Sequence, residues 1–221
     1  MVVSLLARAQ AGAKSFAAFI TVTTLGGLLL APLHGDGARS HRVWADDASF
    51  EPKVVASGAI DLLPDTQLVR EQRVITEFIA KRYRVSDTAV ANYVAAAYRA
   101  GEQYSLDPLL ILAVMAVESR YNPVAESLVG AKGLMQVIPK YHLDKLAELG
   151  GEDALLEPEV NILVGAQILR EYQRRCRDIE AALQMYNGAF DEPTGQYATK
   201  VFAERARLEF LRQKAKKQQS A

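Results

Sequence analysis

Hydrophobic and polar positions alternate with helical periodicity from about residue 65 to near the end of the chain. The stretch 66–83 places its apolar residues close to one stripe, at spacings near the 3.6-residue repeat of an α-helix. These residues are Leu68, Val69, Val74, Ile75, Phe78 and Ile79. A half-buried strand would need strict alternation with a period of two, and no such pattern of useful length occurs. The pattern predicts an all-α fold, or an α-dominated α+β fold.

A second helix is expected between two capping signals. Ser86 or Asp87 offers the N-cap, and the apolar pattern continues to about residue 100. Gly101 then stands where a helix commonly ends on a glycine in the left-handed conformation. We therefore predict a helix that stops at Gly101.

The next predicted helix, over 108–119, differs from the others because it is apolar on all sides. Asp107 is a favourable N-cap, and Pro108 suits the first helical position, where a missing N–H costs little. A helix without a polar face belongs in the interior rather than on the surface. We expect it to be the buried central helix of the domain.

Further helices are predicted near 140–149, 158–174 and 178–187, with a last helix beginning at about residue 195. The charged stretch 206–221 is expected to be a solvated or frayed tail, most clearly from Arg212 onward. The full division is an N-terminal segment over 1–45, a linker or arm over 46–64, a catalytic domain over 65–205 and this tail.

The first 45 residues predict export. Residues 1–35 contain two basic side chains, Arg8 and Lys14, and no acid, and the stretch 15–32 is almost wholly apolar. A basic start before an apolar run is typical of a secretory signal peptide, with a small-residue cleavage site ending at Ala45. The length of the run favours a cleaved signal over a retained membrane anchor. With either one, the catalytic part is expected in the periplasm.

Composition excludes several classes of site. The 221-residue chain has a formal net charge of +0, which argues against a nucleic-acid-binding protein. Its one cysteine, Cys176, is expected to be half-buried and inert, although nearby arginines leave a reactive thiol open. The histidines His34, His41 and His142 have no metal-ligand spacing, so neither a metal nor another cofactor is predicted.

Glu118 is the candidate catalytic residue. It ends the apolar helix, where burial and the negative end of the helix dipole both raise the pKa of a carboxyl group. A raised pKa suits a general acid that works near neutral pH. Spacing alone favours the alternative that this side chain turns outward and meets water or Arg120.

The residues from Glu118 onward form a series of short motifs. They are Glu118-Ser119-Arg120-Tyr121-Asn122-Pro123, Ala125, Ser127, Gly130-Ala131, Gly133-Leu134-Met135-Gln136, Pro139, Asn161-Ile162, Gly165, Ala182-Leu183, Tyr186-Asn187-Gly188, Tyr197 and Val201. In this order and at this spacing, over about 107–201, the chain resembles the catalytic domain of lytic transglycosylases, a branch of the lysozyme-like superfamily. The resemblance shifts the balance toward a catalytic Glu118.

The resemblance implies a lysozyme-like helical domain with a cleft around its buried central helix. It also implies cleavage of the β-1,4 bond between N-acetylmuramic acid and N-acetylglucosamine in bacterial peptidoglycan, with a 1,6-anhydro product. Glu118 would act first as general acid and then as base. Glu126 is the only other acid in the motif loop and is expected to be a solvated side chain, whereas an ordinary glycosidase needs two facing carboxyl groups.

The same resemblance assigns substrate binding to a group of residues around Glu118. Met135 and Gln136 are expected to line the cleft, Gly130 and Gly133 to bring the backbone close to the sugar chain, and Asn161 to pin a helix start. The expected substrate-binding residues are Ser119, Ser127, Met135, Gln136, Tyr186, Asn187 and Tyr197.

Two departures from the family pattern stand out. Tyr121 replaces a common phenylalanine, which is a mild exchange. In addition, Asn187 is followed by Gly188-Ala189 rather than by alanine and glycine, so the residue free to adopt a positive φ moves by one position. The turn after Asn187 is therefore expected to differ.

Three other functions stay open from sequence. One is a muramidase like goose-type lysozymes, in which water is the nucleophile; the others are a non-catalytic peptidoglycan-binding module and a helical scaffold. The expected partner is the peptidoglycan glycan strand. The sequence leaves open whether the protein attaches to the inner membrane, whether it serves an envelope-spanning machinery, and whether it cuts within strands or from their ends.

Overall fold

The computed structural model of the chain describes residues 66–189 and 194–217. In these residues it is all-α, as the sequence predicts, and pairing between extended segments is limited to isolated bridges in one loop. The predicted signal or anchor over 1–45 and the linker over 46–64 lie outside the described residues. The elements are α1 (Gln67–Tyr83), α2 (Asp87–Tyr104), α3 (Pro108–Glu118), η1 (Pro139–Tyr141), α4 (Leu143–Leu146), η2 (Glu152–Leu156), α5 (Pro158–Cys176), α6 (Ile179–Tyr186) and α7 (Gln196–Lys217).

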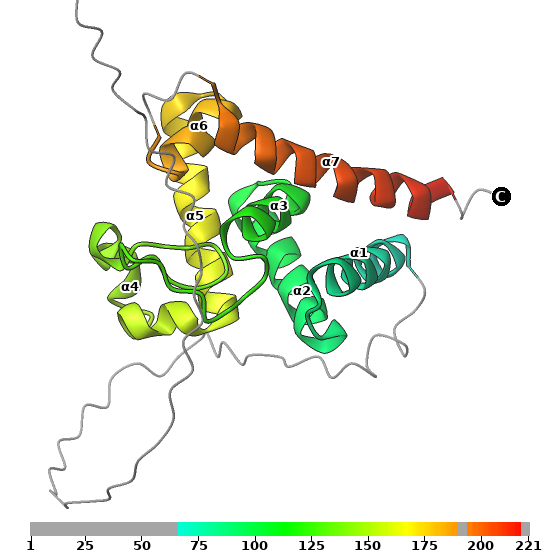
Figure 1. Ribbon diagram of the computed structural model, residues 1–221, viewed down its shortest axis with the longest axis horizontal. Helices are drawn as coiled ribbons and strands as arrows, with labels where there is room; N and C mark the ends of the chain where they lie inside the picture. Colours follow the sequence, from blue (N-terminus) through cyan, green and yellow to red (C-terminus); the bar gives the residue numbers. More distant parts are fainter. Residues whose placement is uncertain (1–65, 190–193, 218–221) are drawn as a thin grey trace, which may run out of the picture. The chain divides into compact units, whose positions relative to one another are not determined.

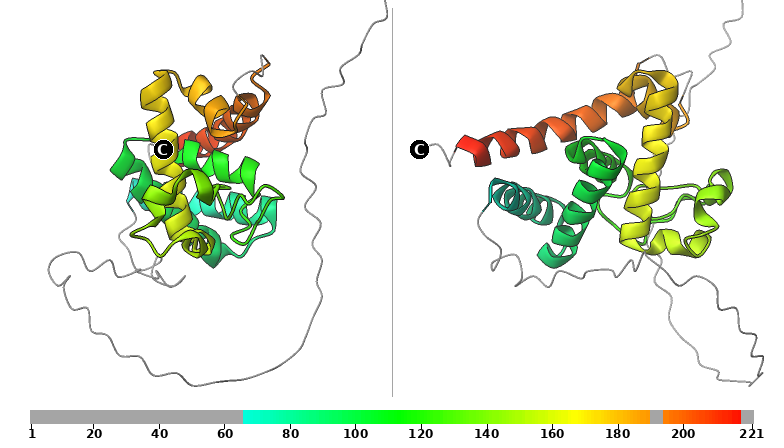
Figure 2. Two further views of the ribbon diagram at one scale, coloured as in Figure 1. Left: turned by 90° about the vertical axis from the view of Figure 1, so that its left-hand side faces the viewer. Right: turned by 180° about the vertical axis from the view of Figure 1, so that it is seen from behind.

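The helix α3 is the buried centre of the domain, as predicted. Every residue from Leu109 to Ala116 is buried, and α3 packs against α2 and α7 (Figures 1 and 2). The Asp107 side chain caps it by accepting a hydrogen bond from the Leu109 N–H at 3.1 Å. An apolar segment surrounded in this way gains from burial along its whole length.

The helix α2 runs past the predicted stop at Gly101 to Tyr104, so that part of the prediction is wrong. Ser105, with φ 53°, is the left-handed residue that ends the helix. Gly101 is buried, and a Cβ there would lie 2.9 Å from the Leu106 carbonyl oxygen. A glycine at position 101 therefore allows the helix to pack closely against the following turn. It does not end the helix.

The helix α7 replaces most of the predicted tail. It continues to Lys217, with Leu208 and Ala215 buried although both lie beyond the predicted domain boundary at 205. Val201, Leu208 and Ala215 recur every seven residues, about two helical turns, and so share one face. On α7, Arg205 also donates to Asp107 at 2.6 Å, which ties α7 to the start of α3.

The helix predicted over 140–149 is broken into two short pieces. The 3₁₀ turn η1 and the four-residue α4 are separated by His142, whose φ of −138° is not helical. The predicted helices over 158–174 and 178–187 correspond to α5 and α6.

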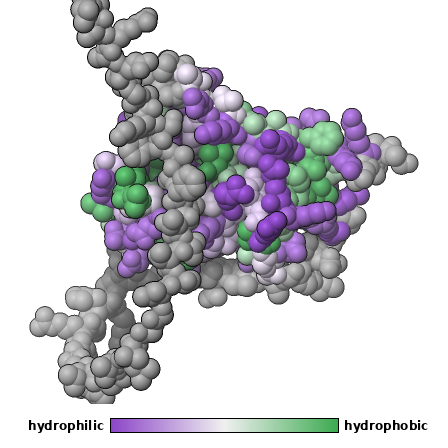
Figure 3. All heavy atoms as spheres, viewed as in Figure 1, coloured by the Kyte–Doolittle hydropathy of each residue, from purple (hydrophilic) through white to green (hydrophobic). Residues whose placement is uncertain are grey.

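The surface of the described helices is mixed. The face shown in Figure 3 is mostly hydrophilic, with smaller hydrophobic patches between the charged side chains. None of the helices described is both long and apolar enough to cross a membrane.

Candidate active site

Glu118 is the last residue of α3 and lies where α3, α6 and α7 approach one another. Its side chain is half-buried. The Tyr197 hydroxyl, from the first turn of α7, donates a hydrogen bond to its Oε1 at 2.6 Å. The carboxyl group therefore points inward to a fixed partner, and does not turn outward to Arg120.

Burial raises the pKa of Glu118 from 4.5 to about 7, and the hydrogen bond from Tyr197 opposes that rise. The protein packed around the carboxyl removes much of its hydration, which penalises the charged form. The tyrosine hydroxyl acts in the other direction because it stabilises the carboxylate. The balance leaves a group that can both hold and release a proton near neutral pH.

A sharp chain reversal follows the carboxylate. Arg120 and Tyr121 have φ values of 54° and 64°, two consecutive non-glycine residues in the left-handed region. The Tyr121 ring is buried edge-on to Tyr83, with centroids 4.9 Å apart, and its hydroxyl donates to the Leu112 carbonyl at 2.9 Å. Burial and this hydrogen bond hold a costly backbone conformation that turns the chain away just after Glu118.

Ser119 lies beside the carboxylate in sequence but is turned into the protein interior. It is 2% exposed, and its hydroxyl is 2.8 Å from the Leu134 carbonyl and 3.2 Å from that of Met115. A serine hydroxyl has one proton to donate, and here these two backbone carbonyls share it. The Ser119 side chain thus links α3 to the following loop.

The polar side chains of the loop after α3 bind the loop's own backbone. Gln136 donates through its side-chain nitrogen to the carbonyls of Ala125 and Gly133, both at 3.0 Å. Ser127 accepts a hydrogen bond from the Ala131 N–H at 3.0 Å. Both residues keep some exposure to solvent, but these bonds give each of them a structural task.

Asn161 of α5 holds this loop through its side-chain hydrogen bonds. It is fully buried, and its Oδ1 accepts from the Met135 N–H at 2.7 Å, while its Nδ2 donates to the carbonyls of Lys132 and Leu155, both at 2.8 Å. A Cβ on Gly133 would lie 2.2 Å from that Nδ2. Gly133 therefore permits close approach to Asn161. Its close approach to a sugar chain stays a prediction.

Met135 is core and does not line a cleft with its side chain. It is 0% exposed, and it fills the space that a side chain at Gly165 of α5 would occupy, 2.6 Å from its sulfur. Its carbonyl accepts a hydrogen bond from the Tyr186 hydroxyl at 2.9 Å. The side chain expected to line the cleft is therefore a packing contact between the loop and α5.

Tyr186 and Asn187 end α6 and face different surroundings. The Tyr186 ring packs edge-on to Tyr172, and burial, together with the nearby charge of Glu118, raises the pKa of its hydroxyl. Asn187 is exposed. Gly188, with φ 70°, follows it, and the N–H groups of Gly188 and Ala189 bond back to Met185 and Gln184. This is a glycine-based helix end, and its positive φ falls on Gly188, as the altered order predicts.

Six of the seven predicted substrate-binding residues separate into two groups, and the exposed Asn187 belongs to neither. Tyr186 and Tyr197 share the immediate surroundings of Glu118, whereas Ser119, Ser127, Met135 and Gln136 hold the loop together. The sequence predicts that Tyr197 closes a cleft, and it does not predict the contact of Tyr197 with the carboxylate. Only the packing of α7 on α3 brings together two residues 79 positions apart.

The remaining expectations concern a second carboxyl group, the single cysteine and metal binding. Glu126 is exposed, as predicted, and Cys176 is half-buried at the end of α5. Within 66–189 and 194–217, no group of three or more histidine, cysteine, aspartate or glutamate side chains could hold a metal ion.

Comparison with known proteins agrees with this description. Residues 93–202, about half of the chain, match the family model of the transglycosylase SLT domain. A transglycosylase of the Enterobacteria phage PRD1 is 38% identical over 103 residues, which are 47% of this chain and 37% of the relative. The membrane-bound lytic murein transglycosylase C of Sodalis glossinidius (strain morsitans) is 34% identical over 93 residues, which are 39% of this chain and 26% of the relative.

A solved structure is also similar. An inactive mutant of the lytic transglycosylase Slt from Pseudomonas aeruginosa aligns with a TM-score of 0.42 and 22% identity, covering 71% of this chain and 29% of that one. The alignments to the two relatives cover well under half of each relative's length. The family match shows that this chain carries a transglycosylase SLT domain.

Proposed function

We propose that this protein is a peptidoglycan lytic transglycosylase in which Glu118 is the single catalytic carboxyl group. Three features support the proposal: the transglycosylase SLT domain, the relatives named as murein transglycosylases, and the half-buried Glu118 with a pKa of about 7. The last of these carries it, because a purely structural glutamate at a helix end has no need of a desolvated carboxyl group.

In the first step, the protonated Glu118 gives its proton to the glycosidic oxygen as the bond from that oxygen to C1 of N-acetylmuramic acid breaks. The sugar's own 2-acetamido group stabilises the positive charge that develops at C1. The N-acetylglucosamine side leaves as an alcohol. Glu118 is then a carboxylate, held in place by the Tyr197 hydroxyl.

In the second step, the Glu118 carboxylate takes the proton of the C6 hydroxyl while O6 forms a bond to C1. The product is 1,6-anhydro-N-acetylmuramic acid, and Glu118 is protonated again for the next cycle. An attacking group tethered to the same sugar enjoys effective molarities of about 10⁵–10⁸ M when its geometry is right. One carboxyl group therefore suffices, and no second carboxyl among the described residues shifts the pKa of Glu118.

Substrate binding is proposed for the residues that remain accessible near this group. Asn187 is exposed at the end of α6, and Ser127 and Gln136 are part-exposed on the loop. Ser119 and Met135 are proposed to act through the loop they stabilise, and not by touching the sugar.

Product analysis tests the proposal against a hydrolytic muramidase. Purified peptidoglycan digested by the full chain should give muropeptides with anhydro ends, each lighter by one water than its hydrolysis counterpart and resistant to borohydride. A product mixture dominated by reducing ends would make the protein a muramidase. Absence of cleavage together with retained sacculus binding would make it a binding module.

Export to the periplasm is proposed from the sequence of residues 1–45. If that segment is a signal or an anchor, deleting it should leave a soluble protein that digests peptidoglycan as the full chain does, because the predicted catalytic domain begins at residue 65. An insoluble or unfolded product would show that the segment belongs to the fold.

A further inference from the structure

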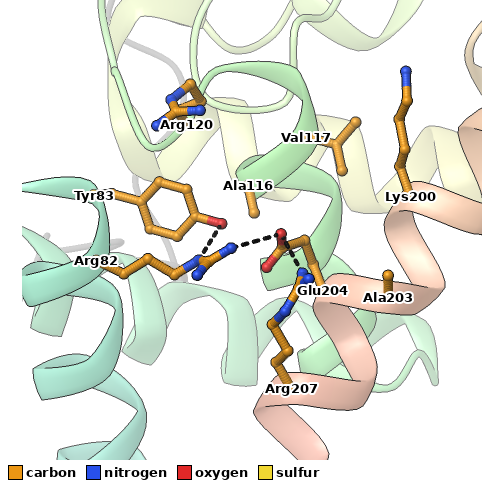
Figure 4. A pocket seen from close by; sticks show the side chains of 9 residues that line it. All are labelled: Arg82, Tyr83, Ala116, Val117, Arg120, Lys200, Ala203, Glu204 and Arg207. Atoms are coloured by element: carbon orange, nitrogen blue, oxygen red, sulfur yellow. Dashed lines mark hydrogen bonds and ion pairs between the residues drawn. The ribbon is translucent and has the colours of Figure 1, made fainter.

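A cationic pocket lies beside the candidate active site. It has a volume of about 590 Å³ and opens where the end of α1, the end of α3 and the middle of α7 meet (Figure 4). Four cationic side chains and one carboxylate line it, namely Arg82, Arg120, Lys200, Arg207 and Glu204. Four positive charges and one negative charge give the lining a net charge of +3.

The one carboxylate is already shared between two of the cations. Glu204 Oε1 accepts from Arg207 at 2.6 Å and from Arg82 at 3.4 Å. In the part of the chain that the structure describes, Arg120 and Lys200 have no ion pair; Arg120 lies over the ring of Tyr83, 5.6 Å from its centroid. The pocket therefore holds positive charge that its own acid does not neutralise.

The position of the pocket ties it to Glu118. Ala116, Val117 and Arg120, which form one wall, flank that residue in the chain. Lys200 is one helical turn beyond Tyr197, whose hydroxyl holds the carboxylate. The pocket and Glu118 thus share α3 and α7, although Glu118 itself does not line the pocket.

We propose that this pocket binds the carboxylates of the peptide stems that muramic acid carries; this inference rests on the proposed function. The glycan itself is neutral where the lactyl group is joined to a peptide, so the anionic groups near the scissile bond belong to the stem. A guanidinium offers a planar fork to a carboxylate, and a lysine adds a mobile point charge. The pocket selects strands that carry peptides over bare glycan.

The test compares two substrates and two variants of the full chain. One substrate is intact glycan strands, and the other is the same strands stripped of their stems by an amidase. The double variant Arg120→Gln/Lys200→Gln should raise KM on intact strands by about tenfold, with kcat nearly unchanged and no effect on stripped strands. Lys81→Gln/Lys214→Gln, at two exposed lysines outside the pocket, removes the same two positive charges and should change neither KM.

Equal losses on both substrates, or no loss on either, would overturn the pocket assignment while leaving the proposed function intact. A second measurement separates the two claims. Titration of a free stem tetrapeptide into the full chain should show binding that the double variant weakens, even if the protein cleaves nothing. Binding to anionic lipid vesicles that the double variant abolishes, without an effect on the tetrapeptide, would assign the pocket to a membrane surface and contradict the proposal. Thermal unfolding of both variants checks that they fold.

Discussion

The two sides of the candidate site use their polar side chains differently. On the helical side, Tyr197 directs its hydroxyl at the Glu118 carboxylate. On the loop side, Ser119, Ser127 and Gln136 direct theirs at backbone groups of the loop. The motif residues that look alike in sequence therefore divide into those that tune one acid and those that keep a loop in shape.

This contrast teaches that a motif can be strong evidence for a function without each of its residues touching the substrate. Between α3 and η1 the loop has turns and isolated bridges in place of a helix or a strand, and it includes left-handed residues, so side chains add to the hydrogen bonds of its backbone. On the helical side, packing holds the elements and the Tyr197 hydroxyl is directed at the carboxylate, while the Tyr186 hydroxyl bonds the Met135 carbonyl of the loop. Substitutions on the two sides should separate activity from stability.

The largest expected effect is on the helical side, at the acid itself. Glu118→Gln keeps the shape and a hydrogen-bond acceptor for Tyr197 but removes the transferable proton. Because one group serves both steps, we expect peptidoglycan digestion to fall by at least about 10³-fold, with folding intact. Dye-release assays with purified sacculi measure it, and near-normal activity would remove Glu118 from the mechanism.

The next largest effect is on the loop side and concerns stability. Asn161→Leu leaves the buried Met135 N–H and two carbonyls without their partners, so the free energy of unfolding should fall by about 3–5 kcal/mol. Asn187→Leu changes an exposed asparagine and should cost less than about 0.5 kcal/mol. Urea unfolding measures both. Equal, small losses in the two variants would show that the hydrogen bonds of Asn161 contribute little to the free energy of unfolding.

A smaller effect distinguishes the two tyrosines near the acid. Tyr197→Phe removes the hydrogen bond that stabilises the carboxylate, so the pKa of Glu118 should rise above 7 and activity should fall roughly tenfold. The alkaline limb of the pH–rate profile should move to higher pH. Tyr186→Phe, whose hydroxyl bonds the Met135 carbonyl instead, should leave that limb in place. A shift of the same size in both variants would contradict the division.

The smallest effect is expected at the tip of the loop. Ser127→Ala loses one part-exposed hydrogen bond, so stability should fall by about 0.5–1 kcal/mol and activity by no more than roughly threefold. Ser119→Ala, whose hydroxyl is buried, should lose about 1–3 kcal/mol. A large activity loss in Ser127→Ala with unchanged stability would show that this serine contacts the substrate.

Much of the fold follows from local sequence signals. The buried α3 is evident from its apolar composition and its Asp107-Pro108 start, and α1 from its stripe. The end of α2 and the length of α7 were not predictable in this way. Gly101 is inside its helix because of a close contact with Leu106, and α7 continues over a stretch in which Leu208 and Ala215 are buried.

The candidate site shows the same division. Glu118 could be found from its place at the end of an apolar helix together with the motif that follows. Its contact with Tyr197, the three hydrogen bonds of Asn161 and the cationic pocket each join elements far apart in sequence. Periodicity and capping rules act over a few residues, so they carry no information about such contacts.

The central claim is that the surroundings of Glu118 hold a proton on it near neutral pH, and its pKa can be measured directly. Carbon-detected NMR titration of the full chain, with Glu118→Gln to assign the signal, should give a pKa of about 7, against 4.5 for an ordinary glutamate. Because the folded pKa is raised, the wild type should lose stability relative to Glu118→Gln as pH rises from about 4.5 to 7, by roughly 3 kcal/mol, and the difference should then stay constant. A measured pKa near 4.5 with no such pH-dependent difference would contradict the account.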